Sequence, residues 1–172
     1  ELSGNSYHVI YNRENELHAS AVLDGVTIQG GNADGEQYTD QSRGGGIFNV
    51  VSHPMFRNLI VRDNYAYDGG GIYNGEGFAV FFHVIIHDNQ AVNGGGLYNA
   101  PGDSGFMDVI IKDNQAIEGA GVYDTGSNTV MVNMKIQGNE AEDDGGGLYV
   151  MNSDPQLTNV LISGNRARAG GG

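Results

Sequence analysis

The fold of this protein is decided by the stretch Phe-Phe-His-Val-Ile-Ile-His-Asp-Asn-Gln-Ala-Val-Asn-Gly-Gly-Gly-Leu-Tyr, residues 81–98. Its pattern recurs along the chain, most visibly as glycine triplets, with Ala120 replacing the central glycine of one triplet. Successive triplets are separated by 25, 25, 25, 26 and 25 residues, because they begin at Gly44, Gly69, Gly94, Gly119, Gly145 and Gly170. A repeat of this length is typical of a solenoid protein.

Other positions keep the same period. One column is asparagine, another is aromatic, and a third is large and apolar before each asparagine. The asparagines are Asn64, Asn89, Asn114, Asn139 and Asn165, and the aromatic residues are Phe48, Tyr73, Tyr98, Tyr123 and Tyr149. Within each repeat, polar and apolar residues alternate, as in residues 133–137. This alternation predicts half-buried strands rather than helices.

We therefore predict an all-β fold, a right-handed parallel β-helix of about six coils with a repeat of 25–26 residues. Coils spaced by ~4.8 Å give a rod roughly 30 Å long. We expect residues 1–172 to form a single β-helical segment, an excerpt of a longer protein. Residues 1–21 form a poorly registered start, and residues 22–172 carry the repeats, with an insertion near residues 34–43.

Turn chemistry adds three expectations. Asparagine tolerates left-handed backbone angles, so the asparagine column predicts a tight bend between two sheets. Glycine triplets permit positive φ and close backbone approach. The three prolines, Pro54, Pro101 and Pro155, mark one loop face of the rod, and the extra residue of the fourth step predicts a one-residue loop insertion.

Composition excludes several classes of protein. The chain has 29 glycines but only 3 prolines in 172 residues, so it is not collagen. Its 8 basic and 21 acidic residues give a net charge of −13, which argues against nucleic acid as a partner. No apolar run is long enough to predict membrane insertion by this segment. The absence of cysteine excludes a disulfide scaffold and thiol catalysis.

The paired motifs Val61-Arg62-Asp63-Asn64 and Gly69-Gly70-Gly71-Ile72 resemble the F-x-x-N and G-G-A-I/L/V repeats of polymorphic outer-membrane proteins. They are also similar to the G-G-G-hydrophobic-Tyr-Asn repeats of bacterial β-helix surface proteins, which have a pectin-lyase-like fold. The resemblance covers residues 20–172, with Val or Ile in place of Phe and Gly in place of Ala. It implies a secreted or cell-surface protein with passenger, adhesin or scaffold roles, and it supplies no catalytic residues.

Acidic residues provide the candidates for chemistry. Asp143 and Asp144 form an adjacent acid pair, but they occupy the same turn as other repeats, so we expect no catalytic residue there. Asp63, Asp88 and Asp113 form a column before the asparagines. Stacked carboxylates repel each other, so this column predicts either hydrogen bonds to the turn backbone or a bound Ca²⁺ ion.

The aromatic column offers the candidate ligand site. Tyr73, Tyr98, Tyr123 and Tyr149 would form a platform for sugar rings if they face outward, and an ordinary core stack if they face inward. Strand alternation allows both arrangements.

The regularity of the repeat predicts a non-catalytic structural or adhesive segment that serves as a stalk, passenger or assembly scaffold. Its expected partners are other copies, by end-to-end stacking of coils, or surface glycans and host proteins. The alternative is a carbohydrate-binding or polysaccharide-degrading β-helix, with lyase- or hydrolase-like chemistry. We expect no cofactor other than the candidate Ca²⁺.

Overall fold

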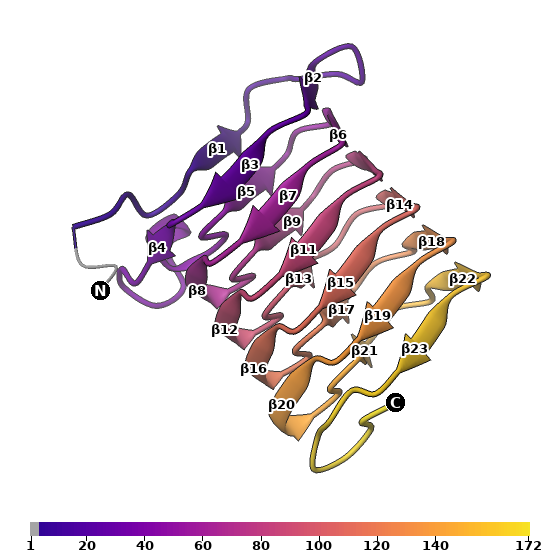
Figure 1. Cartoon of the computed structure of the whole chain (residues 1–172). Helices are drawn as coiled ribbons and strands as arrows, with labels where there is room; N and C mark the ends of the chain where they lie inside the picture. The colour runs from indigo at the N-terminus through magenta and orange to yellow at the C-terminus, as the bar shows by residue number, and fades with distance from the viewer. Residues whose placement is uncertain (1–3) are drawn as a thin grey trace.

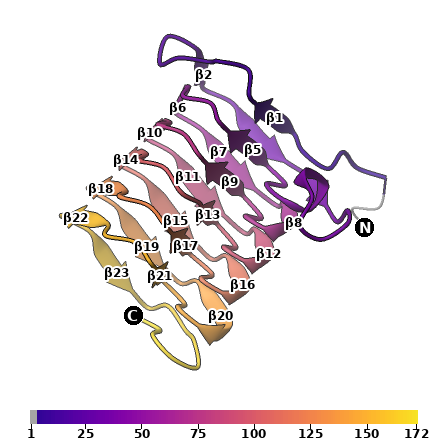
Figure 2. The ribbon, with the colours of Figure 1, turned by 180° about the vertical axis from the view of Figure 1, so that it is seen from behind.

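The computed structural model describes residues 4–172 and consists of parallel strands wound into a solenoid (Figure 1). Each full coil contributes one strand to each of four parallel sheets, which we name A, B, C and D in chain order. The first coil, in indigo, and the last, in yellow, lie at opposite ends of the rod, as the view from behind also shows (Figure 2). The predicted parallel β-helix is confirmed.

The strand bounds follow the repeat. Sheet A contains β1 (Ile10–Arg13), β5 (Ile47–Val50), β9 (Ile72–Gly75), β13 (Leu97–Asn99), β17 (Val122–Thr125) and β21 (Leu148–Met151). Sheet B contains β2 (Val22–Asp24), β6 (Met55–Arg57), β10 (Val80–Phe82), β14 (Gly105–Met107), β18 (Val130–Val132) and β22 (Gln156–Thr158). Sheet C contains β3 (Thr27–Gln29), β7 (Ile60–Arg62), β11 (Ile85–His87), β15 (Ile110–Lys112), β19 (Lys135–Gln137) and β23 (Leu161–Ser163). Sheet D contains β4 (Asn32–Ala33), β8 (Tyr65–Asp68), β12 (Gln90–Asn93), β16 (Gln115–Glu118) and β20 (Glu140–Asp144).

Equivalent residues of successive repeats pair directly across the strands. Phe81 of β10 pairs with Phe106 of β14, and Ile86 of β11 pairs with Ile111 of β15. These side chains are fully buried and belong to one core that runs along the inside of the solenoid. Each coil therefore buries its apolar face against identical faces above and below it, which a single 25-residue coil could not do.

An asparagine ladder runs through the interior between sheets C and D. The Nδ2 group of Asn89 donates to Oδ1 of Asn114 at 3.0 Å, and Asn114 donates to Asn139 at 3.0 Å in the same way. Each Oδ1 also accepts the backbone N–H of the preceding ladder residue, as Asn114 does from Asn89 at 3.0 Å. Asn114 and Asn139 are 0% exposed, so these amides are satisfied entirely within the protein.

The bends differ from the prediction in one respect. The asparagines of the ladder do not adopt positive φ; the residue before each of them does, with φ values of 53° at Asp63, 55° at Asp88 and 68° at Gly138. Asp and Gly tolerate this left-handed region. The asparagine is thereby left in an extended conformation, with its side chain turned inward to the ladder. The first glycine of each triplet also has positive φ, as at Gly69 with φ 71°.

The extra residue of the fourth repeat is a second difference. We predict a loop insertion, but the register shifts within sheet D, where Ala116 pairs with Ala141 and Glu118 pairs with Asp144. The additional residue is therefore a β-bulge in β20. A bulge accommodates one residue locally without disturbing the neighbouring coils.

The N-terminal coil keeps the strand register of the later coils more closely than the sequence indicates. Residues 10–13 form β1, which pairs with β5 in the register of the later coils, including Tyr11 opposite Phe48. Residues 14–21 form a long connection to β2, which hides this register in the sequence. The segment between β4 and β5, where the sequence predicts an insertion, contains a short 3-10 helix, η1 (Asp40–Ser42). No helix in the described part of the chain is long and apolar enough to cross a bilayer.

Replacing Asn114 with alanine tests the ladder. The substitution removes the acceptor for Asn89 and the donor to Asn139, and each buried polar group left unpaired costs ~1–3 kcal/mol. We expect the free energy of unfolding in urea to fall by about 3 kcal/mol or more. Gln137→Ala, at an exposed strand position, is the control and should change it little. A loss similar to that of the control would contradict a stabilising role for the ladder.

A pair of glycine substitutions tests the close approach of coils. A Cβ atom at Gly71 would lie 2.6 Å from the backbone oxygen of Gly96, whereas a Cβ at Gly105 meets nothing within 4 Å. Because overpacking against backbone costs ~1–3 kcal/mol, Gly71→Ala should lower the urea midpoint clearly. Gly105→Ala should leave it unchanged or raise it, since alanine restricts the unfolded chain. Equal effects of the two substitutions would be inconsistent with this packing.

Candidate functional site

The four candidate tyrosines form one row on the outer face of sheet A. Ile72, which precedes Tyr73 in β9, is fully buried in the core, and successive strand residues point to opposite faces. Tyr73 therefore points outward, and Tyr98, Tyr123 and Tyr149 pair in register with it. The structure thus settles the direction of the column, which the sequence leaves open.

The tyrosine rings stack on each other rather than standing free. Ring centroids lie 5.2 Å apart between Tyr73 and Tyr98, 4.7 Å between Tyr98 and Tyr123, and 4.8 Å between Tyr123 and Tyr149. Tyr73 and Tyr123 are only 8% and 7% exposed. Because neighbouring rings cover both faces of Tyr98 and Tyr123, those faces are not available to a sugar. Ligand binding by this row stays a prediction that the geometry does not favour.

Burial controls the ionisation of this row. Removal from water raises the pKa of Tyr73, Tyr98 and Tyr123 above the ordinary value of 10.0, because the phenolate is poorly solvated there. The negative charge of Asp68 raises the pKa of Tyr98 further. The Arg43 guanidinium, 5.2 Å from the centre of the Tyr73 ring, opposes the rise at Tyr73.

The predicted metal ligands Asp63, Asp88 and Asp113 lie at successive exposed bends. Each carboxylate faces the basic residue immediately before it rather than a shared ion. The partners are Arg62 for Asp63 at 2.9 Å, His87 for Asp88, and Lys112 for Asp113 at 3.1 Å. Within residues 4–172, no three His, Cys, Asp or Glu side chains are grouped as a metal site. Arg62 and Lys112 supply the charge compensation at Asp63 and Asp113, for which the sequence offers Ca²⁺ or backbone donors.

The acid pair Asp143 and Asp144 lies at the β-bulge. Asp144 pairs with Glu118, as the repeat predicts, and the register shift that precedes this pair lies between Ala141 and Asp144 on β20. The Asp143 carboxylate lies 3.7 Å from the Arg168 guanidinium and both groups are exposed, so their mutual stabilisation is small.

A second interior ladder ends at a carboxylate. Asn74 donates to Asn99 at 2.9 Å, and Asn99 donates to Oδ1 of Asp124 at 2.8 Å. Asp124 is 0% exposed, and the next coil places Val150 beside it. Oδ1 also accepts hydrogen bonds from Ser127 and Thr129, while Oδ2 has no partner among the described residues. A carboxylate suits this position because the last residue of the ladder has to accept hydrogen bonds but has no side chain above it to receive one.

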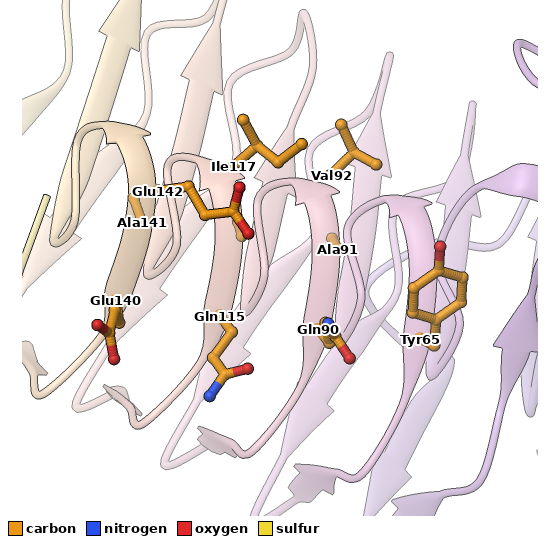
Figure 3. Close-up of a pocket in the computed structure, with 10 residues that line it drawn as sticks. Tyr65, Gln90, Ala91, Val92, Gln115, Ile117, Glu140, Ala141 and Glu142 are labelled. Carbon is orange, nitrogen blue, oxygen red and sulfur yellow. The ribbon is translucent and has the colours of Figure 1, made fainter. Parts of the chain in front are cut away.

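A surface hollow lies on the outer face of sheet D. It is a groove of about 440 Å³ formed by β8, β12, β16 and β20, and it runs from coil to coil along the rod (Figure 3). One side carries Gln90, Gln115 and Glu140, and the other carries Val92, Ile117 and Glu142. Small alanines of the three later strands lie along the ribbon between the two rows. The groove is therefore lined by an exposed polar row and by a largely apolar row, and each row ends in a glutamate on β20.

Sequence reasoning passes over this groove, although its signal is present. Tyr65, Gln90, Gln115 and Glu140 directly follow the ladder asparagines, so they form a polar column with the same period. The signal gains meaning only when the fold places this column beside the Val92–Ile117 row on one outer face.

Comparisons of this chain with protein-family models, curated proteins and solved structures found no match. The function is therefore argued from the geometry of this chain.

The pH dependence of stability tests the environment of the tyrosine row. Burial raises the pKa of Tyr98 in the folded protein. The contribution of the protonated Tyr98 hydroxyl to the free energy of unfolding is therefore fully present below the ordinary tyrosine pKa and is lost as pH rises through the raised value. We expect the free energy of unfolding to fall above about pH 10, and part of the phenolate absorbance to appear at a higher pH than in the unfolded chain.

Tyr98→Phe should remove part of the absorbance that appears at this higher pH. Tyr38→Phe, at a ring that is 72% exposed, is the control and should leave that absorbance unchanged. If Tyr98→Phe left the absorbance at this higher pH unchanged, its assignment to Tyr98 would be wrong.

Proposed function

We propose that this β-helix is a non-catalytic structural segment of a secreted or cell-surface bacterial protein, acting as a stalk, passenger or assembly scaffold. The observation that carries the proposal is the asparagine ladder, which joins Asn64 to Asn165 without a break. A continuous interior ladder makes the coils one elongated body. Such a body is suited to holding other parts of a protein at a fixed distance.

The surface supports the same role. Repeating residues occupy the same positions on successive coils, as Asp63, Asp88 and Asp113 do, and Arg62 and Lys112 neutralise the first and the last of them locally. A catalytic centre needs a local departure from the repeat, with groups of different chemistry brought together. The main departures here are the bulge in β20 and the two N-terminal excursions, at residues 14–21 and 34–43.

Assembly is the form of partnership that we favour for this role. At one end of the described rod, β21, β22 and β23 each pair with a strand on one side only. Leu157 and Leu161 are 40% and 51% exposed there. Unpaired parallel edges with apolar side chains accept a further coil, either from the same protein or from another copy of this chain, which is our candidate partner. Surface glycans or host proteins remain the alternative for an adhesive role.

Deleting one whole coil tests the structural role. Removal of residues 90–114 from the full parent protein joins Asn89 to Gln115 and so preserves the repeat. A spacer should keep its circular dichroism and its display on intact cells, measured by antibody labelling. The rod should shorten by about 5 Å in X-ray scattering. Removal of residues 90–102, about half a coil, is the control and should prevent folding.

Two outcomes would contradict the proposal. One is that the whole-coil deletion unfolds the protein as the half-coil deletion does. The other is that the intact parent protein cleaves a polysaccharide and loses that activity when residues 90–114 are removed.

A further inference from the structure

The groove on sheet D has an amphipathic cross-section. Its polar wall consists of Gln90, Gln115 and Glu140, which are exposed and repeat at the spacing of the coils, ~4.8 Å. Its opposite wall is formed by Val92, by Ile117, which is 37% exposed, and by Glu142 at the β20 end. A molecule that fits this groove needs a row of hydrogen-bonding groups along one edge and an apolar surface along the other.

One end of the groove carries an aromatic ring. Tyr65 stands at the end of the amide row, with its hydroxyl group toward the side of Val92 (Figure 3). Tyr65 pairs with Asn32 of the coil before it and with Gln90 of the coil after it. Unlike the tyrosines of sheet A, it therefore has no aromatic residue at the equivalent position of a neighbouring coil. Beyond Tyr65 a second hollow of about 630 Å³ shares Tyr65 and Gln90 with the groove and continues along the rod toward Asn32; this hollow is acidic, because Asp34, Asp63 and Asp88 also line it.

The charge of the groove limits the ligand. The protein has a net charge of −13, which disfavours a polyanion. The centre of the groove carries the uncharged amides of Gln90 and Gln115, and its carboxylates, Glu142 and Glu140, lie together at the β20 end, where Glu140 is 3.5 Å from Arg166. A polycation would therefore find no row of free carboxylates along the centre of the groove. An uncharged ligand matches it best.

We propose that the sheet D groove binds an extended, uncharged polysaccharide chain lying along the solenoid axis. Sugar hydroxyls would donate to and accept from the amides of Gln90 and Gln115 and would donate to Glu140. The C–H faces of the sugar rings would pack against Val92 and Ile117, and the end ring against Tyr65. This inference goes beyond the structural role, because a scaffold folds and spans a distance with or without a ligand on its side.

The peptide backbone of sheet D supports an extended sugar over an extended peptide. Parallel neighbours already pair the backbone groups of β12 and β16, so the outer face offers no strand edge for a peptide to extend. Recognition there depends on side chains, which suits a ligand whose hydroxyl groups project from both edges.

Binding of uncharged hexasaccharides to the full 172-residue chain tests the proposal. The probes are β-1,4-linked hexamers of glucose, mannose, xylose and N-acetylglucosamine, with oligolysine of similar length as the charged comparison. Nuclear magnetic resonance of the side-chain amides reports the site directly. We expect at least one hexasaccharide to shift the amide signals of Gln90 and Gln115 and to bind in a saturable manner.

Variants separate the groove from the rest of the surface. The double variant Gln90→Ala, Gln115→Ala should weaken binding about tenfold or more, as expected for two lost hydrogen bonds. Gln137→Ala on sheet C is the matched control and should leave it unchanged. Glu140→Gln should bind within about threefold of the original, because an amide also accepts a hydroxyl. All these side chains are exposed, and circular dichroism verifies that each variant is folded.

Three outcomes would overturn the proposal: no hexasaccharide binds, oligolysine alone binds, or binding survives the double glutamine variant. None of them bears on the coil-deletion experiment, so failure of the ligand site and failure of the structural role are distinguishable.

Discussion

The asparagine ladder is the constraint on which the rest of this structure depends. An amide can donate and accept at once, so each buried asparagine satisfies the one above and the one below, as Asn114 does with Asn89 and Asn139. A slip of one residue in any coil would place a flanking residue, such as Asp88 or Gln90 in place of Asn89, in this column and leave several amides unpaired in the core. The ladder therefore fixes the register, while the apolar stack of Phe81 and Phe106 supplies the burial.

Fixed register has consequences for every outer face, because each residue then lies beside its own equivalent. Aromatic residues benefit, and the tyrosines of sheet A become a stack whose faces are covered. Acidic residues would suffer from like charges, and the chain compensates with a basic neighbour, as in the pair Lys112–Asp113. Glutamines carry no charge, so Gln90 and Gln115 lie side by side on sheet D without repulsion. Their row is exposed beside Val92 and Ile117. Stacking in register thus produces a row of aromatic rings with covered faces on sheet A and an open groove on sheet D.

The exceptions to the repeat lie where a ladder or a coil ends. Asp124 terminates the second polar ladder, because the following coil carries Val150 at that position and offers no amide. The bulge in β20 absorbs the extra residue of the fourth repeat without shifting Asn139 or Asn165 from their ladder. The irregular residues are therefore placed where they do not interrupt the hydrogen bonds that hold the register.

The sequence by itself determined the solenoid, its period and its columns, because a repeat of short strands can bury its apolar residues only by stacking in register. It did not determine which side of sheet A the tyrosines face, since both faces of a strand alternate with the same period. It misplaced the left-handed residue by one position and read a bulge as a loop, because both depend on local backbone angles. The sheet D groove was decided by the tertiary structure alone. The Gln90 and Val92 columns become two walls of one site only when four strands lie side by side.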